Sequence, residues 1–155
     1  MTKNHVQQFV KMKTLTRSPA ILLLFFVAGS CGVIPAGEQD SYDLVVYGGT
    51  PGGITAAVQV ARMGKTALII EPGNRLGGAS SGGLGWADIG VEQTIGGMSL
   101  EFFQRIYDYY QQDSVWKYQH RENYQPRGNH AVVEGGPMWS FEPGAAKYVF
   151  EKMVH

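Results

Sequence analysis

The strongest constraint on this chain is the glycine-rich stretch 48–53 (GGTPGG), which separates two segments of different periodicity. Before it, residues 43–47 (DLVVY) form a short apolar run of β-formers, typical of a strand buried on both faces. After it, residues 54–61 carry apolar side chains at helical spacing, up to a helix stop at Gly64. Residues 66–70 (TALII) then predict a second buried strand. The order strand, turn, helix, strand predicts a βαβ unit.

The turn between the first strand and the helix suits a negatively charged ligand. Such a turn aims several backbone N–H groups and the positive end of the helix dipole at one point, where a pyrophosphate finds donors. Glycine is needed because a Cβ would block the phosphates and the neighbouring strand. An acid at the end of the second strand accepts hydrogen bonds from ribose hydroxyls, and Glu71 stands 23 residues after Gly48. The predicted dinucleotide site comprises Gly48, Gly49, Thr50, Pro51, Gly52, Gly53 and Glu71.

Thr50 departs from the usual fingerprint of such turns. The pattern G-x-G-x-x-G, laid from Gly48, puts Thr50 at the middle glycine and Gly53 at the third. Thr50 must therefore hold its backbone near the phosphates despite a β-branched side chain, and the extra glycines at 49 and 52 offset this. The alternative interpretation is a glycine-rich turn with a purely structural role.

A second glycine-rich loop, residues 71–85 (EPGNRLGGASSGGLG), does not continue an ordinary α/β unit. We expect it to pass along the pyrophosphate and to present backbone amides and hydroxyls toward the far end of an extended dinucleotide. Arg75 would pair with a phosphate or stack on the adenine, and the alternative is a solvated loop cation. For Ser80 and Ser81 the alternative to ligand binding is turn capping.

These two glycine-rich motifs resemble those of FAD-dependent oxidoreductases of the glutathione-reductase-like superfamily. Residues 94–97 (TIGG) and 139–143 (WSFEP) are similar to a secreted bacterial group often labelled "xanthan lyase". The resemblance implies an α/β fold, an incomplete Rossmann-like FAD-binding βαβ domain with a parallel sheet. It implies FAD as cofactor, with Gly48–Gly53 on the pyrophosphate, Glu71 on the ribose and backbone from Gly77 and Gly78 to Gly83 near the flavin. These residues do not support the lyase label, because a polysaccharide lyase does not require a dinucleotide-binding turn.

The rest of the chain is less specific. We expect helices over 97–111 and 142–155, a polar excursion or substrate-side insertion over 112–129, and a strand over 130–134. No acid or base stands out as catalytic, since His120 and His130 are candidates by type only. The chain is expected to be an N-terminal fragment whose missing C-terminal part completes the sheet. Its substrate is expected to be a small molecule, such as a sugar, alcohol or amine, that gives a hydride to the flavin.

The N-terminal residues predict export. Four basic residues precede a nine-residue apolar run at 20–28, the pattern of a signal peptide over 1–30. Small residues then lead to Cys31, which resembles the lipidated cysteine of bacterial lipoproteins, and cleavage near Ala36 is the competing interpretation. Residues 31–41 read as a tether and 42–155 as the folded domain, in the periplasm or lipid-anchored to the cell envelope.

Composition excludes several other classes of protein. Cys31 is the single cysteine, so no intrachain disulfide, iron–sulfur cluster or cysteine-based zinc site can form, and no metal site is expected. The chain lacks the basic stripe that nucleic acid requires. Two rival functions stay open: an NAD-dependent Rossmann reductase, which an acid at position 71 suits equally, and a non-catalytic exported domain.

Overall fold

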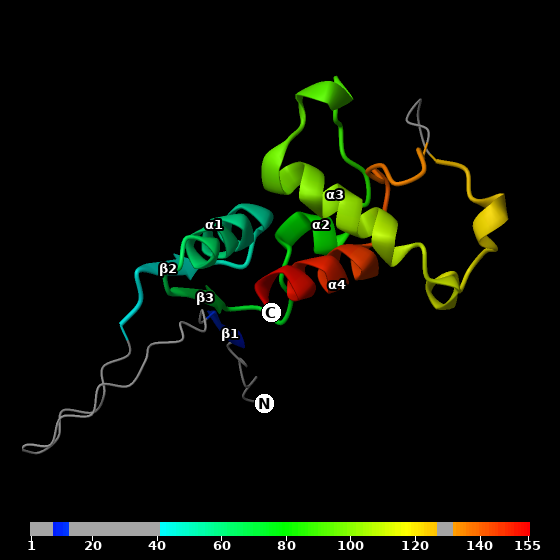
Figure 1. The fold of residues 1–155 in the computed structure, drawn as a ribbon. Coiled ribbons are helices and arrows are strands. Elements are labelled where there is room, and N and C mark those ends of the chain that lie inside the picture. The colour runs from blue at the N-terminus through cyan, green and yellow to red at the C-terminus, as the bar shows by residue number, and fades with distance from the viewer. Residues whose placement is uncertain (1–7, 13–40, 127–131) are drawn as a thin grey trace, which may run out of the picture.

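A βαβ unit forms one side of the fold in a computed structural model that describes residues 8–12, 41–126 and 132–155 (Figure 1). Strand β2 (Leu44–Tyr47) leads through the glycine turn into helix α1 (Pro51–Arg62), which returns the chain to strand β3 (Ala67–Glu71). The two strands are parallel, with Leu44 opposite Ala67 and Tyr47 opposite Ile70. The predicted strand–turn–helix–strand order is confirmed. The strand bounds lie within about one residue of those expected, whereas α1 begins earlier, at Pro51 inside the glycine-rich stretch.

Local sequence accounts for the shape of this unit. Helix α1 buries Ile54, Ala57 and Val58 against the sheet, and the small Ala57 allows the close approach that a helix needs there. Gly64 has a left-handed φ of +77° and donates its N–H to Ala61 O at 3.0 Å, so the helix ends where a glycine permits it. The two strands start together because the Asp43 carboxylate accepts hydrogen bonds from the Thr66 N–H and hydroxyl, at 2.8 and 2.9 Å.

A third strand makes the sheet mixed, whereas we expected an entirely parallel one. Strand β1 (Gln8–Met12) pairs antiparallel with β3, which gives the strand order β1-β3-β2. An antiparallel neighbour needs no crossover helix, so a remote segment can join the free edge of β3 through backbone hydrogen bonds alone. The pairing places residues 8–12 of the predicted signal peptide at the sheet. The apolar run 20–28 and Cys31 lie outside the described residues, and the signal peptide stays a prediction.

The remaining helices gather at the ends of β2 and β3 from which the glycine loops leave (Figure 1). They are α2 (Gly78–Gly82), α3 (Gly97–Tyr109) and α4 (Pro143–Val154), and α4 contacts α1, α2 and α3. Aromatic rings join α3 to α4: Phe102 stacks on Phe150 with ring centroids 4.5 Å apart. This apolar cluster fixes the helices over the two glycine loops.

No helix in the described ranges is long and apolar enough to cross a membrane.

Two expectations about the connecting segments were wrong. The segment 71–85 was expected to be a loop, but residues 78–82 form the short helix α2. Glycines with positive φ on either side, Gly77 and Gly83, start and end this helix, and such turns are available only where no Cβ interferes. The described part of the expected strand 130–134 is not a strand. Val133 instead begins a turn, in which its carbonyl accepts the Gly136 N–H at 2.9 Å.

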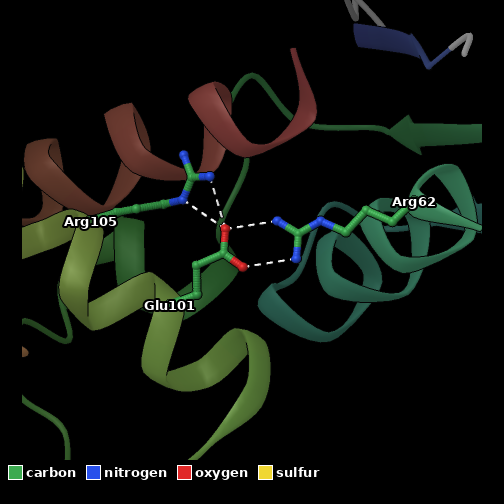
Figure 2. Close-up of polar contacts among 3 residues, drawn as sticks. All are labelled: Arg62, Glu101 and Arg105. Carbon is green, nitrogen blue, oxygen red and sulfur yellow. Dashed lines mark hydrogen bonds and ion pairs between the residues drawn. The ribbon is translucent and has the colours of Figure 1, made fainter.

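Helix α3 is also tied to α1 by charge. Glu101 accepts two hydrogen bonds from the Arg62 guanidinium, at 2.7 and 2.8 Å, and a third from Arg105 Nε at 2.9 Å (Figure 2). Arg105 lies one turn further along α3, so the carboxylate bridges two cations from different helices. The hydrogen bonds from Arg62, the largest cause, and those from Arg105 lower the pKa of Glu101 below its ordinary value.

This ion-pair group predicts a pH-dependent contribution to stability. Because the folded-state pKa of Glu101 is lowered, its contribution is fully present above its unfolded pKa and is lost as pH falls through the folded pKa. Glu101→Gln should lower the free energy of unfolding at neutral pH by less than ~1 kcal/mol, since the group is partly exposed. Denaturant unfolding at neutral and acidic pH measures this, with Glu134→Gln, at an exposed acid, as the control. An equal difference from wild type at both pH values would contradict it.

Candidate cofactor-binding site

Thr50 is the N-cap of α1, which explains why a threonine stands where the fingerprint has glycine. Its hydroxyl accepts the Gly53 N–H at 3.2 Å and its carbonyl accepts the Ile54 N–H at 2.9 Å. Its backbone is extended, with φ −70° and ψ 165°, so no glycine is required for conformation. Pro51 follows at the first helical position, where its missing N–H costs nothing. The Thr-Pro pair before an amphipathic segment was the sequence signal for this cap, and our sequence analysis overlooked it.

Glycine is required at two other positions of the turn because neighbouring atoms already occupy the space. A Cβ on Gly53 would overlap the Gly48 carbonyl oxygen and lie 2.8 Å from Val46 Cγ1, so α1 could not pack this closely on β2. A Cβ on Gly49 would overlap Leu76 Cδ2 and lie 3.1 Å from Glu71 Oε2. The turn is therefore held between its own strand and the second glycine loop.

Glu71 lies beside the turn, at the end of β3, where the sequence predicted it. Its Oε2 accepts the Gly49 N–H at 2.6 Å and its Oε1 accepts the Gly73 N–H at 2.7 Å. A carboxylate has about four acceptor sites, so two remain for other donors. The side chain is only partly buried, which leaves those acceptors accessible. Glu71 thus holds both glycine loops and keeps capacity for the hydroxyls of a ribose.

Several N–H groups of the turn are already used within the fold. Gly48 donates to Ile70 O at 2.8 Å and continues the parallel ladder, while Gly49 and Gly53 bind Glu71 and Thr50. The N–H groups of Thr50 and Gly52 find no acceptor among the described residues. They lie at the amino end of α1, where the helix dipole favours negative charge. These two donors are the ones available to a phosphate.

The second glycine loop lies directly on the first. Gly77 donates its N–H to Gly49 O at 2.7 Å, and a Cβ on Gly78 would lie 3.3 Å from Pro51 Cδ. Ser80, two residues after Gly78, lines a cavity of about 510 Å³ together with Pro51 and Gly52. The structure therefore brings the predicted turn residues, Glu71, Gly77, Gly78 and Ser80 together.

Arg75 and Ser81 hold the loop itself. Ser81 is buried, and its hydroxyl donates to Leu76 O at 2.5 Å. Arg75 donates from Nη1 to Ser81 O at 2.9 Å, and its side chain is exposed rather than directed into the cavity. For Ser81 these are the turn-capping contacts that were the alternative to ligand binding, and the exposure of Arg75 agrees with its alternative, a solvated loop cation. Their predicted contacts with a cofactor stay predictions.

The 510 Å³ cavity has the form expected of an organic cofactor site. One side is lined by Pro51, Gly52 and Thr55 at the start of α1. The other walls come from α2 and the loop after it, from α3 and from Phe141 and Phe150, without an ionisable side chain among the described lining residues. The described part of the chain contains no group of three or more His, Cys, Asp or Glu that would hold a metal ion. A site of this kind offers backbone donors and apolar surface rather than charge.

Comparison with known families decides between the classes of dinucleotide protein. A model of the family described as "FAD dependent oxidoreductase" matches residues 43–155, which is most of the chain and nearly all of its described part. The chain belongs to the FAD-dependent oxidoreductases. The cofactor of this family is FAD, which agrees with the cofactor that the two glycine motifs led us to expect.

One curated relative is a 4-oxocyclohexanecarboxylate 2-dehydrogenase from Sinomonas cyclohexanicum, 44% identical over 50 residues. The match spans 31% of this chain and 9% of the relative. Among solved structures, none matches this sequence significantly. The likeness to the relative supports an oxidoreductase, and nothing finer follows from so short a match.

The residues of the site fit FAD. The turn offers two N–H groups without acceptors among the described residues, at Thr50 and Gly52. The carboxylate of Glu71 stands next to these groups with acceptor capacity left. In this FAD-dependent oxidoreductase, Thr50 and Gly52 would hold the pyrophosphate and Glu71 the ribose.

The cap role of Thr50 leads to a test of the turn. Thr50→Ala removes the acceptor of the Gly53 N–H and should lower the free energy of unfolding by about 1 kcal/mol. Thr50→Ser keeps the hydroxyl and should recover most of that loss. Denaturant unfolding of the three proteins measures the effect, and equal losses in both variants would show that the methyl group, not the hydrogen bond, matters.

Proposed function

We propose that this chain is the FAD-binding portion of an enzyme that takes a hydride from a small organic or sugar-like substrate. The observation that supports the proposal is the contact between Glu71 and Gly49, because it brings a carboxylate suited to ribose hydroxyls next to the N–H groups of the turn. When bound, FAD accepts two electrons as a hydride, so that a substrate alcohol loses this hydride and its hydroxyl proton and becomes a carbonyl compound.

The residues of this chain contribute binding and orientation. The N–H groups of Thr50 and Gly52 would donate hydrogen bonds to the pyrophosphate oxygens without help from a side-chain cation. The α1 dipole would strengthen these bonds. Glu71 would orient the adenosine end, while the apolar walls formed by Phe102 and Phe150 exclude water from the other end. The relative's printed name, a dehydrogenase, supports the same class of reaction.

We place the chain in the glutathione-reductase-like type of FAD domain, within the secreted bacterial group that its motifs resemble. Supporting this are the parallel β2 and β3, the glycine turn between β2 and α1, and the acid at the end of β3. A C-terminal continuation of the same protein would supply further strands and the rest of the substrate site. The family match favours FAD over the NAD-dependent reductase that the sequence left open, and a flavin absorbance spectrum of the purified protein tests this directly.

A substitution at Glu71 tests the proposed function. Glu71→Gln keeps one acceptor oxygen but replaces the other with an amide that faces a backbone N–H, so the clamp and the ribose acceptor are both weakened. FAD affinity should fall by ~1–3 kcal/mol, which is about tenfold or more. Titration of the 155-residue chain with FAD, followed by flavin fluorescence, measures it.

Asp88→Asn is the matched control, because Asp88 is an exposed acid in the loop that follows α2. Circular dichroism of both variants checks that the fold is kept. If Glu71→Gln and the control bind FAD as wild type does, Glu71 has only a structural role and the proposed ribose contact is wrong.

Export and lipidation are part of the proposal, since Cys31 follows the expected signal peptide. When the gene is expressed in a bacterium, the wild-type protein should take up labelled fatty acid and sediment with membranes. Cys31→Ser should lose the label and leave the membrane fraction. Release of both proteins in soluble form would instead support ordinary cleavage near Ala36.

A further inference from the structure

A second cavity, of about 600 Å³, lies on the other side of the wall that bounds the cofactor site. This volume is within the range of small-molecule sites. Its lining comes from three separate segments: the end of the second glycine loop, the excursion after α3, and the residues that lead into α4. Six aromatic side chains line it: Trp86, Tyr110, Trp116, Tyr118, Tyr124 and Phe141.

Specific contacts hold these rings in place. Trp116 donates its Nε1–H to Tyr110 O at 2.9 Å, and its ring lies 5.1 Å from that of Tyr110 and 5.5 Å from that of Tyr124. The Tyr110 hydroxyl accepts the Glu142 N–H at 2.9 Å, which ties α3 to the start of α4. Because burial raises the pKa of Tyr110, this hydroxyl stays neutral. The pocket is therefore built before any ligand arrives.

The pocket adjoins the cofactor cavity. Trp86 and Phe141 line both cavities, so they form a shared wall. The wall is fixed by backbone pairing: Phe141 donates its N–H to Gly85 O at 2.8 Å, and Trp86 and Ser140 form an isolated β-bridge. A molecule in the pocket would thus be separated from a flavin in the cofactor cavity only by the Trp86 and Phe141 side chains.

The charges around the pocket favour a neutral ligand. Lys117 and Glu142 both line it, so the charged side chains of the lining carry opposite charges and give the pocket no net charge that would favour an ion of either sign. The amides of Gln119 and Gln125 and the hydroxyl of Ser140 add donors and acceptors of both kinds. Such a mixture suits hydroxyl groups, which donate and accept at once. The aromatic faces carry negative partial charge and suit the polarised C–H face of a saturated ring.

We propose that this pocket binds a neutral, hydroxylated six-membered ring, a pyranose sugar, as the substrate of the proposed oxidoreductase. The substrate role rests on the proposed function, whereas ring binding itself does not need FAD. The test therefore uses the 155-residue chain without flavin, titrated with methyl β-glucopyranoside and followed by tryptophan fluorescence and by NMR of the indole N–H groups. Saturable changes at Trp86 and Trp116 are expected.

Tyr118→Ala is the main variant, because its side chain is 88% exposed and its loss should leave the fold intact. Removing one stacking ring should weaken the sugar roughly threefold to tenfold. Tyr47→Ala is the matched control, a tyrosine 75% exposed on β2 and outside the pocket, and it should bind as wild type does. A second variant, Trp86→Leu, should also weaken binding, and circular dichroism verifies its fold.

Three results would overturn the proposal: no saturation with the sugar, equal weakening by Tyr118→Ala and Tyr47→Ala, or tighter binding of tetramethylammonium or cyclohexanecarboxylate than of the sugar. The last would assign the pocket to a charged ligand. Loss of FAD affinity in Glu71→Gln with sugar binding unchanged supports both proposals. If the protein binds the sugar but never binds FAD, the proposed sugar pocket stands and the proposed oxidoreductase function is wrong.

Discussion

The contacts of one residue, Gly49, hold the cofactor site together. Its N–H is bound by the Glu71 carboxylate at 2.6 Å, its carbonyl accepts the Gly77 N–H at 2.7 Å, and its missing Cβ leaves room for Leu76. Through these three contacts the first glycine turn, the end of β3 and the second glycine loop share one geometry. Because Glu71 also binds the Gly73 N–H, a change in its charge or position would move both loops. The N–H groups of Thr50 and Gly52, which would bind a phosphate, follow Gly49 in the same turn and so depend on this clamp.

Helix α4 extends that geometry to the rest of the domain. The ring of Phe150 occupies the space over Gly77, so that a Cβ there would overlap it, and the same ring stacks on Phe102 of α3. Helix α3 is in turn bound to α1 through Glu101 and Arg62. Contacts therefore link α1 to α3, α3 to α4, and α4 to the second glycine loop. Apolar packing contributes most of the stability of these contacts, because partly exposed ion pairs add little.

Local signals explain which parts of this arrangement could be predicted from sequence. The βαβ unit was predictable because its periodicity changes at the glycines, and α3 and α4 carry clear apolar faces. Helix α2 was not, since a Gly-Ala-Ser-Ser-Gly segment has no apolar periodicity and forms only where the flanking glycines turn the chain. The residues 132–134 failed as a strand because β-propensity needs a partner strand, and the described fold offers none there. The glycine turn and Glu71 could be predicted because a dinucleotide requires these residue types at this spacing. The pairing of 85–87 with 139–141 could not, because it joins segments far apart in the chain and no local sequence pattern indicates it.

The cofactor cavity has a consequence for how its ligand is recognised. Among its described lining residues there is no lysine or arginine, so the charge of a pyrophosphate would be met by backbone N–H groups and by the dipole of α1. A lysine on a flexible stem tolerates shifts of the backbone around it. Fixed N–H groups do not, because a hydrogen bond weakens steeply as its distance and angle depart from ideal values. Recognition here therefore depends on the position of the backbone more than on net charge. Gly49, Gly53 and Gly77 fix that position, because each lets a neighbouring protein atom occupy the space of a Cβ.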